Sequence, residues 1–478
     1  MRKRRPFARG ALNRYSAVTV QRRVYEDFQS HFDSEGRFSC PCGQVHRLLT
    51  RSVITGKGAL AQSADLLLKT RGAAPVLWVL SDENTEAAAG AAWKEGVKAA
   101  RIVSRVLPAR PRPEPSMHVI EELGREARNA APDLLVSVGS GVISDLVKRV
   151  SFDLGIPNWC VATAASVDAF TSATSSVHVG GFHNAVPAAV SEAVICDLDV
   201  IARSPREMTL AGLGDLLAKF IAHLDWSLSR IVTGEHFCDV ISTAALDSAR
   251  KALAAARTLD QDPAQASGAL ADAVITSGFS MQVAGSSRSA ASVEHMMAHF
   301  WEIADAVRNE RLDLHGILVG TASRAVLRGY RAFYRAFPRM KVKRDERLKA
   351  FAAERPWQET LEPGLAPYRQ KVSEEMERKK IDAATLQERL ARLEESREKI
   401  LQIAPPALDE LAESVSVLES LDYPFSRGEI GLSEELFLLP VRNVRLLRAR
   451  YSTFDLAWEM GQERVIYDEI RSHVLAGD

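Results

Sequence analysis

Four residues in the second half of the chain have the types and the spacing of a small metal site. Asp215 follows Gly212-Leu-Gly at the start of a predicted helix, and farther along come His295, His299 and His315. The four-residue spacing of His295 and His299 places both on one face of a helix. One aspartate with two histidines forms an open nitrogen–oxygen site that suits zinc or another divalent metal, which can polarise a substrate carbonyl. Because a helical pair of histidines is more often structural, spacing alone leaves both interpretations open.

A turn in the first half of the chain could bind phosphate. The apolar run Leu134–Val138 predicts a buried strand that stops at Gly139-Ser140-Gly141, and a helix follows to about Leu154. Small residues between a strand and a helix let backbone N–H groups approach a pyrophosphate, and the helix N-terminus favours its negative charge. The third glycine of the full dinucleotide fingerprint is absent, so this turn by itself is a weak signal.

Asp82 ends an earlier predicted strand, which contains the apolar run Val76–Leu80. An acidic side chain there could accept hydrogen bonds from the adenosine ribose of a dinucleotide and repel a 2′-phosphate, which favours NAD over NADP. An acid at a helix N-terminus is an equally good interpretation.

The cysteines suggest a second, weaker candidate for metal binding. Cys40, Cys42 and His46 lie within seven positions of one another, but no fourth ligand is evident, so a structural or inert role is favoured. The sequence has five cysteines in all, an odd and sparse number that does not resemble a disulfide framework. The other cysteines are Cys160, Cys196 and Cys238.

The elements that must position these residues fall into two parts. Residues 49 to 199 alternate predicted strands and helices, which is typical of a parallel α/β sheet. After Asp199 the helical period dominates to the end of the chain. We therefore expect an α/β domain over residues 1–200 and a helical domain over residues 201–478. Residues 339–398 are dense in charged side chains and predict a solvated helical insertion.

The bulk composition excludes some classes of protein. The 478 residues include 61 Lys plus Arg and 61 Asp plus Glu, a balance that argues against a nucleic-acid-binding protein. No apolar stretch reaches the roughly 18 residues of a membrane span, and no apolar core follows the basic N-terminus. We expect a reduced, cytoplasmic protein.

The motifs together resemble those of the sn-glycerol-1-phosphate dehydrogenases of the bacterial type. This family lies within the wider group of metal-dependent alcohol dehydrogenases, glycerol dehydrogenases and dehydroquinate synthases. The similarity covers about residues 45 to 335 and 420 to 465. It rests on the following segments, in this order: Val138–Gly141 with Asp145, Val161–Asp168, Phe170–Ser172, Cys196–Asp199, Gly212–Asp215, Ser286–Ser292, Glu294–His295, His299, Leu314–Gly316 and Arg448–Leu456.

The resemblance implies a dehydroquinate synthase-like architecture, with a Rossmann-like N-terminal domain, an all-α C-terminal domain and the site in the cleft between them. It implies NAD(H) or NADP(H) as coenzyme, one divalent metal (zinc first, nickel or iron as alternatives), a small and phosphorylated substrate, and a homodimer. Asp82 is added because it ends a predicted strand, as argued above. The expected coenzyme-binding residues are then Asp82, Gly139, Ser140, Gly141, Val142, Ile143, Asp145, Thr163, Ser166 and Ser172. The expected metal ligands are Asp215, His295 and His315.

The resemblance also implies that Asp168, Asp215 and His299 contact the substrate and take part in catalysis, with His299 relaying a proton. The phosphate of dihydroxyacetone phosphate needs a cation, and Arg288 and Lys219 are the nearest candidates in sequence. We expect Arg288 to bind the substrate.

Three departures from the family pattern leave the substrate open. His183 stands where the family carries a lysine, and Ala169 and Val293 add bulk near the expected pocket. A dehydrogenase for another polyol or polyol phosphate is therefore the first alternative. A dehydroquinate synthase-like cyclase and an inactive binding protein rank lower, because the cations are few and the expected metal ligands are all present.

Overall fold

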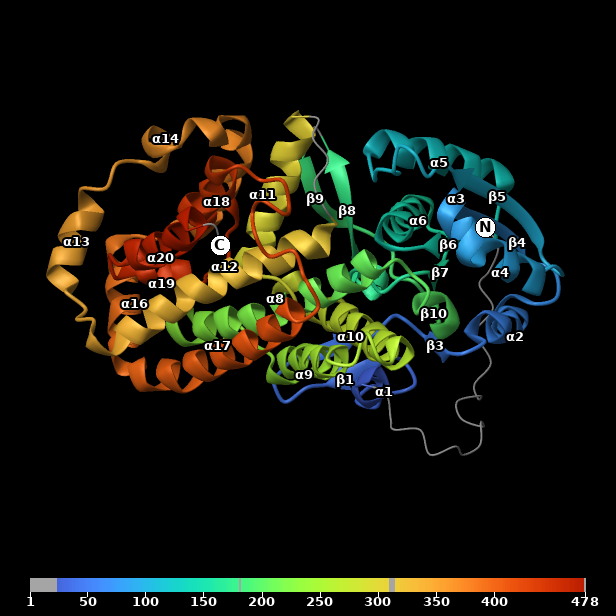
Figure 1. Cartoon of the computed structure of the whole chain (residues 1–478), viewed down its shortest axis with the longest axis horizontal. Helices are drawn as coiled ribbons and strands as arrows, with labels where there is room; N and C mark the ends of the chain where they lie inside the picture. The colour runs from blue at the N-terminus through green and yellow to red at the C-terminus, as the bar shows by residue number, and fades with distance from the viewer. Residues whose placement is uncertain (1–23, 180–181, 309–313, 477–478) are drawn as a thin grey trace.

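The computed structural model describes residues 24–179, 182–308 and 314–476. Figure 1 shows two halves, one built around a sheet and the other almost entirely of helices. The predicted fold class is confirmed by this arrangement. Within the described residues no helix is both long and apolar enough to cross a membrane.

The first half is built on a six-stranded, fully parallel sheet in the order β3-β10-β7-β6-β4-β5. Its strands are β3 Ser52–Gly56, β4 Val76–Asp82, β5 Arg101–Leu107, β6 Leu134–Gly139, β7 Asn158–Ala162 and β10 Ala193–Asp197. The surrounding helical segments are α2 Ala59–Arg71, α3 Glu83–Thr85, η1 Glu86–Gly90, α4 Ala91–Gly96, α5 Met117–Ala130, α6 Gly141–Leu154 and α7 Leu198–Ile201.

Strand β4 marks the point where the order of the sheet reverses. The chain runs outward from β4 to β5 and then crosses back to β6 on the other side of β4, with Leu77 opposite Leu134. In open parallel sheets, ligands bind beyond the carboxyl ends of the strands at such a reversal. Asp82 and Gly139 are the last residues of β4 and β6, so both candidate coenzyme motifs lie at this point.

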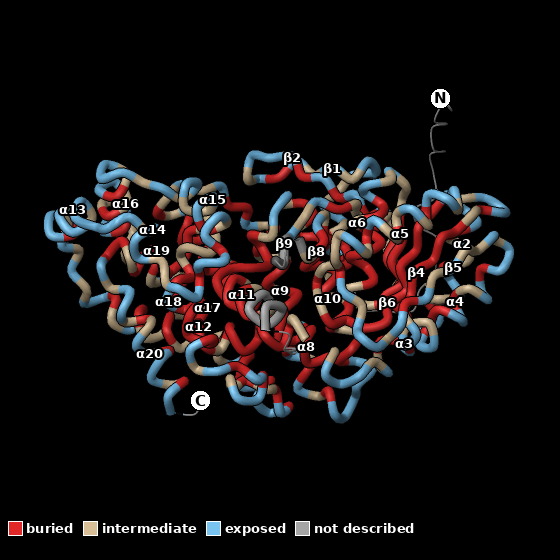
Figure 2. The backbone as a smooth tube through the Cα atoms, turned by 90° about the horizontal axis from the view of Figure 1, so that it is seen from above, coloured by how far each residue is buried: buried red, intermediate tan, exposed pale blue. Residues whose placement is uncertain are grey.

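The two faces of the central strands pack into separate cores. Leu77 and Val79 belong to one apolar cluster, whereas Trp78 and Leu80 belong to another, as the two-residue period of a strand requires. Figure 2 shows these strands as buried along most of their length. The continuous apolar run of β4 therefore reflects a sheet covered on both sides.

The second half is helical, and a long buried helix, α8, runs through it. Its elements are α8 Arg206–Thr233, α9 Asp239–Ala256, α10 Pro263–Ala284, η3 Ser287–Ser289, α11 Val293–Arg308, α12 His315–Ala336, η4 Phe337–Arg339, α17 Arg397–Glu419, α18 Glu434–Leu447, α19 Thr453–Glu459 and α20 Glu463–Leu475. The last strand of the sheet ends at Asp197 and α8 begins at Arg206. We keep the domain division at residues 200 and 201 as a proposal.

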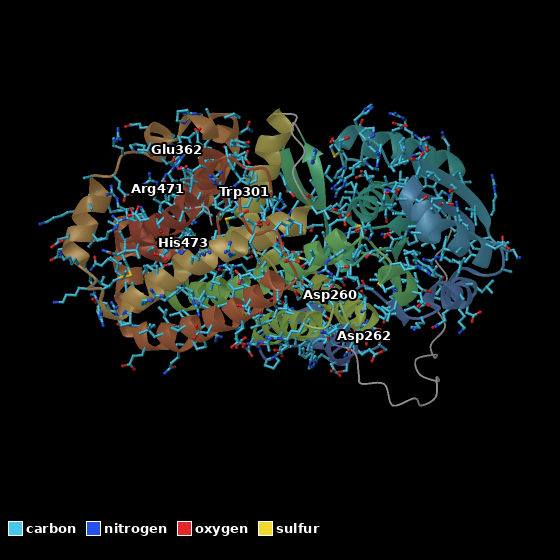
Figure 3. All side chains as sticks on the ribbon, viewed as in Figure 1. Asp260, Asp262, Trp301, Glu362, Arg471 and His473 are labelled. Carbon is cyan, nitrogen blue, oxygen red and sulfur yellow. The ribbon has the colours of Figure 1, made fainter. Side chains whose placement is uncertain are left out.

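The charged segment 339–398 forms a peripheral helical layer over this half. It consists of α13 Arg344–Ala352, α14 Trp357–Thr360, η5 Pro363–Tyr368, α15 Arg369–Lys379 and α16 Ala383–Glu395. One face of α16 is fully buried, through Leu386, Leu390 and Leu393. Glu362, which Figure 3 labels at this edge of the molecule, pairs with Arg442 of α18 at 2.8 Å. The segment is thus helical and charged as predicted, but part of it packs into the core.

The N-terminal elements pack against the helical half although they precede the sheet in sequence. They are α1 Val24–Gln29, β1 Arg37–Ser39 and β2 Val45–Arg47, and the last two form an antiparallel hairpin. The rings of Phe28 and Phe279 stack at 6.4 Å, which joins α1 to α10. Figure 1 shows α1 and β1 lying beside α9 and α10.

Candidate active site

A cleft of about 1310 Å³ lies where the carboxyl ends of the strands face α8, α11 and α12. The segment η2 Ala169–Thr171 and the hairpin β8 Thr174–Val179 and β9 Phe182–Pro187 follow β7 beside it. Fourteen of the residues predicted for the site line this cleft. They are Asp82, Ser140, Gly141, Val142, Ile143, Asp145, Thr163, Ser166, Ser172, Asp168, Asp215, His295, His299 and His315.

The phosphate turn, Gly139-Ser140-Gly141, joins β6 to α6 as predicted. Ser140 is the N-cap residue of α6, and its hydroxyl lies 2.6 Å from the hydroxyl of Ser166. A β-carbon on Gly141 would lie 3.0 Å from a methyl of Val167, so only glycine keeps this surface flat. The turn therefore presents backbone and small side chains to the cleft at a helix N-terminus, which is an arrangement that favours anions.

Asp82 also acts as a helix cap. Its carboxylate accepts a hydrogen bond from the backbone N–H of Thr85 at 2.9 Å, and the Thr85 hydroxyl lies 3.0 Å from the Asp82 N–H. The helix-terminus interpretation is thus confirmed. Because Asp82 lines the cleft as well, one of its carboxylate oxygens remains a candidate acceptor for a ribose hydroxyl.

Asp145 and Lys148, both on α6, hold segments that line the cleft. Lys148 is fully buried and donates to the backbone oxygens of Ala169 and Thr174, each at 2.7 Å, and to the Ser172 hydroxyl at 3.0 Å. Burial raises the pKa of Asp145, while the neighbouring Lys148 works in the opposite direction. This pair fixes η2 and the strand after it, so it positions residues that line the cleft.

Asp215, His295 and His315, which we call the metal triad, come together from α8, α11 and α12. One candidate ligand atom from each lies within 4.8 Å of the others, and Nε2 of His295 is 3.3 Å from a carboxylate oxygen of Asp215. Gly214 makes this approach possible, because a β-carbon there would collide with the Gly316 carbonyl and the Tyr423 hydroxyl. Gly214 thus serves close packing of α8 on α12, and Gly212 lets α8 approach the backbone of Ala165 after β7.

Two glutamates, the buried Glu294 and the partly buried Glu302, orient the histidines of the triad. Nδ1 of His295 donates to Glu294 at 2.9 Å, and Nδ1 of His315 donates to Glu302 at 2.8 Å. Glu302 also accepts from Nδ1 of His299 at 2.9 Å. Carboxylates in this position fix the ring and the tautomer of a metal-binding histidine, leaving Nε2 as the ligand atom. Glu302 was missed by the sequence analysis.

The charges of the site are set by these contacts. Burial raises the pKa of Asp215, but Lys219 and His295 outweigh burial and hold that pKa well below its usual range. Burial lowers the pKa of His299 to about 3, so its ring is neutral. For His315, burial lowers the pKa, but Glu302 and other carboxylates outweigh it and raise the pKa to about 9.

Lys219 links the two aspartates of the site. Its ammonium lies 2.7 Å from Asp168 and 3.3 Å from Asp215, and it is fully buried. Ser277 donates to the same Asp168 oxygen at 2.7 Å, and the Asp168 N–H donates to Asp215 at 3.2 Å. Lys219 therefore neutralises two carboxylates of the protein, and it is not one of the residues that line the cleft.

Arg288 is not one of the residues that line the cleft, although its neighbour Ser287 is. Its guanidinium is buried, pairs with Glu235 at 2.9 Å and donates to the backbone oxygen of Tyr451 at 2.8 Å. These contacts give it a structural role, in place of the substrate-binding role expected from its position in the sequence. The prediction failed because proximity in sequence to the candidate ligands does not fix the direction of a side chain.

Arg448 is a cation that the sequence analysis did not single out. It lines the cleft near His299 and is half-buried at the end of α18. Within the described part of the chain, no hydrogen bond or ion pair is assigned to its guanidinium. Burial lowers the pKa of Arg448, and the nearby Glu375 works in the opposite direction. His183, in β9, has a side chain outside those described.

Comparisons with known proteins agree with the motifs. Residues 54–205 match the family model described as iron-containing alcohol dehydrogenase. Glycerol-1-phosphate dehydrogenase [NAD(P)+] from Geobacillus thermodenitrificans is 29% identical over 202 residues, which are 42% of this chain and 50% of the relative. The corresponding enzyme from Sulfurisphaera tokodaii is 35% identical over 216 residues, which are 45% of this chain and 61% of the relative. The chain thus spans between half and about three-fifths of the length of these relatives.

A solved structure extends the likeness over most of the fold. A probable glycerol dehydrogenase from Sinorhizobium meliloti superposes with a TM-score of 0.54 at 16% identity, covering 88% of this chain and 98% of that one. At this identity the likeness shows the fold alone. By sequence, the chain is therefore similar to glycerol-1-phosphate dehydrogenases and, over residues 54–205, to the iron-containing alcohol dehydrogenase family model, as its motifs predicted.

Proposed function

We propose that this relative of the glycerol-1-phosphate dehydrogenases is an NAD(P)-dependent oxidoreductase that interconverts dihydroxyacetone phosphate and sn-glycerol 1-phosphate. One observation carries the proposal: a single cleft is lined by the phosphate turn, the metal triad and the cationic side chain of Arg448. A coenzyme, a carbonyl and a phosphate can each be bound there by groups suited to them.

The sheet side of the cleft fits a dinucleotide. The pyrophosphate would lie on the phosphate turn, at the N-terminus of α6, and Asp82 would accept from a ribose hydroxyl. Thr163, Ser166 and Ser172 line the cleft between the turn and the metal triad, where the nicotinamide half would lie. Asp82 favours NAD over NADP.

The donor set of the metal triad fits a divalent metal. It offers one ionised carboxylate and two histidines whose Nδ1 atoms are already held by glutamates. Because the pKa of His315 is raised to about 9, its Nε2 would release a proton when a metal binds. Zinc is the first candidate and nickel or iron the alternatives, because imidazole suits all three. When bound, the metal and the nicotinamide would supply Lewis acidity toward the carbonyl oxygen and hydride for the carbonyl carbon.

Asp168, His299 and Arg448 would act on the substrate. Arg448 would bind the phosphate by its guanidinium fork. His299 is neutral, and because Glu302 accepts from Nδ1, its Nε2 can accept the hydroxyl proton in the direction of glycerol phosphate oxidation. Asp168, held by Lys219 and Ser277, would orient a substrate hydroxyl.

A dehydrogenase for an unphosphorylated polyol is the second candidate. Lys219 and Arg288 both form ion pairs inside the protein. Neither of these two expected cations is therefore available to bind a substrate phosphate. The two candidates differ in whether Arg448 binds a phosphate. The homodimer expected from the resemblance stays a prediction.

NADH oxidation by the metal-loaded protein tests the proposal. We expect dihydroxyacetone phosphate to be reduced, unphosphorylated dihydroxyacetone to be reduced poorly, and Asp215→Ala to abolish both reactions. The product should be the sn-1 enantiomer, identified with a stereospecific glycerol-3-phosphate dehydrogenase that does not oxidise it. Equal rates with both ketones would favour the second candidate, and no turnover despite bound metal and NADH would reject both.

A further inference from the structure

We propose that Cys40, Cys42, His46 and Cys238 bind a second divalent metal, zinc by their chemistry, at a structural site separate from the cleft. We call these four residues the cysteine cluster. One ligand atom from each lies within 4.8 Å of the others, and none of the four lines the cleft. The sequence places three of them together, and the fold adds Cys238 from almost 200 positions away.

The distances within the cluster fit tetrahedral coordination. The sulfurs of Cys40 and Cys238 are 3.5 Å apart, and the Cys42 sulfur is 3.3 Å from Nε2 of His46. A tetrahedral zinc with Zn–S of about 2.3 Å and Zn–N of about 2.0 Å places two sulfurs roughly 3.7 Å apart and a sulfur and a nitrogen roughly 3.5 Å apart. These two pairs of ligand atoms are therefore close to coordination spacing, and the other pairs lie within 4.8 Å. Three cysteines and one histidine make a closed site, which is typical of structural zinc.

The histidine of the cluster is oriented as a metal ligand. Nδ1 of His46 is bound to the backbone oxygen of Val283 at 3.0 Å, which requires the ring to carry its proton on Nδ1. Nε2 therefore carries a lone pair toward the three sulfurs. In zinc sites, a histidine ligand usually donates its other ring N–H to a carboxylate or a backbone carbonyl, and this hydrogen bond fixes the tautomer.

The elements that carry the cluster are two short pieces of backbone. Cys40 and Cys42 lie in the turn between β1 and β2, where Gly43 has a φ of 88°, and His46 is on β2. Cys238 is the N-cap residue of α9. Cys40, His46 and Cys238 are buried, so a metal there would be shielded from water.

A metal at the cysteine cluster would stabilise the β1–β2 hairpin. Two strands of three residues cannot form a stable hairpin alone. Just beyond β2, the backbone N–H groups of Leu49 and Thr50 donate to Gln282, whose amide donates in turn to the backbone oxygen of Thr171 at 2.7 Å. A metal that holds the hairpin to α9 would therefore also steady η2, which lines the cleft through Ala169.

Metal content and thiolate absorption test the site independently of enzyme activity. Cobalt-loaded full-length protein should show a thiolate-to-cobalt charge-transfer band in the near ultraviolet, which an aspartate–histidine site cannot produce. The band should remain in Asp215→Ala and disappear in Cys238→Ser. The Asp215→Ala variant should bind one zinc ion per chain, and the double variant Asp215→Ala/Cys42→Ser should bind none. Cys42 is chosen because it is half-buried, so its substitution is less disruptive to folding than that of a fully buried cysteine.

Cys160→Ala is the matched control, because Cys160 is a buried cysteine of the sheet outside the cluster. It should retain both the band and the metal. In the Asp215→Ala background, which lacks the metal triad, chelation should lower the Tm of the protein with and without Cys160→Ala, and it should leave the Tm of the Cys238→Ser variant unchanged. Absence of the charge-transfer band, equal metal content in Cys42→Ser and wild type, or a Cys40–Cys238 disulfide in protein purified with zinc would each overturn the proposal.

Discussion

Oε1 of Glu302 accepts a hydrogen bond from Nδ1 of His315 at 2.8 Å, although the two residues lie on different helices. The other oxygen of Glu302 accepts from His299 at 2.9 Å. One carboxylate thus sets the ring orientation of a candidate metal ligand and of the candidate proton acceptor together. Removing its charge should loosen both without touching the metal triad itself.

Glu302→Gln should weaken metal binding about 10- to 100-fold, the usual effect of losing a carboxylate behind a histidine ligand. Metal affinity can be measured by competition with a chromogenic chelator, with circular dichroism to show that the fold is intact. Glu398→Gln, which changes an exposed glutamate on α17, is the control and should bind metal like the wild type. Unchanged affinity in Glu302→Gln would mean that His315 is not a ligand or needs no support.

Gly141→Ala should raise the KM for the coenzyme and leave the metal content unchanged. The new β-carbon would lie 3.0 Å from Val167 and cover backbone that we assign to the pyrophosphate. Gly124→Ala on α5 is the matched control, because a β-carbon there meets nothing within 4 Å. NADH binding followed by fluorescence separates the two variants. Equal affinity in both would place the coenzyme elsewhere.

Asp225 should make the stability of the protein depend on pH. Burial raises the pKa of Asp225 from 3.8 to about 6, so the folded protein binds this proton more tightly than the unfolded chain does. The contribution of protonated Asp225 to the free energy of unfolding is therefore complete below about pH 4 and is lost as the pH rises through about 6. The loss amounts to ~3 kcal/mol.

Asp225→Asn removes this titration and tests the pH effect. Urea unfolding at a series of pH values should show the wild type losing stability relative to Asp225→Asn between about pH 4 and 6. Asp65→Asn, at an exposed position on α2, should follow the wild type. A difference between Asp225→Asn and wild type that is constant across the range would refute the assignment.

Lys379 connects the charged segment 339–398 to the cleft. Its ammonium pairs with Asp455 at 2.6 Å and donates to the backbone oxygens of Arg445 and Arg448, at 3.3 and 3.4 Å. Lys379→Met should shift the chain at Arg448 and raise the KM for a phosphorylated substrate roughly three- to tenfold, with kcat little changed. The exposed neighbour Lys380, substituted as Lys380→Met, is the control. A KM effect of equal size for unphosphorylated dihydroxyacetone would show a general loss of structure instead.

Local patterns in the sequence predicted the parts of the fold that depend on nearby residues. The apolar run before Gly139 predicted β6, and the change of period after Asp199 predicted the helical half. The spacing of His295 and His299 correctly placed them on one face of α11, where their rings lie 6.2 Å apart. In each case the signal is a period or a turn that a few consecutive residues create.

Contacts between distant segments could not be predicted in this way. Glu302 was missed because a glutamate one turn after a histidine is common on any helix. Cys238 was not recognised as a partner of Cys40, and Arg448 was not recognised as a cation of the cleft, because the fold alone brings them there. Arg288 was assigned to the substrate because it is close to the ligands in sequence, but Glu235 and Tyr451 hold it inside the helical half.

The steady-state kinetics of Arg448→Ala test the central claim most directly. With metal-loaded protein and NADH, kcat/KM for dihydroxyacetone phosphate should fall roughly 100-fold, the cost of about 3 kcal/mol for removing a charged phosphate contact. The same parameter for unphosphorylated dihydroxyacetone should stay within about twofold of its wild-type value. An equal fall for both substrates, or none for either, would contradict the assignment of this cleft to a polyol phosphate.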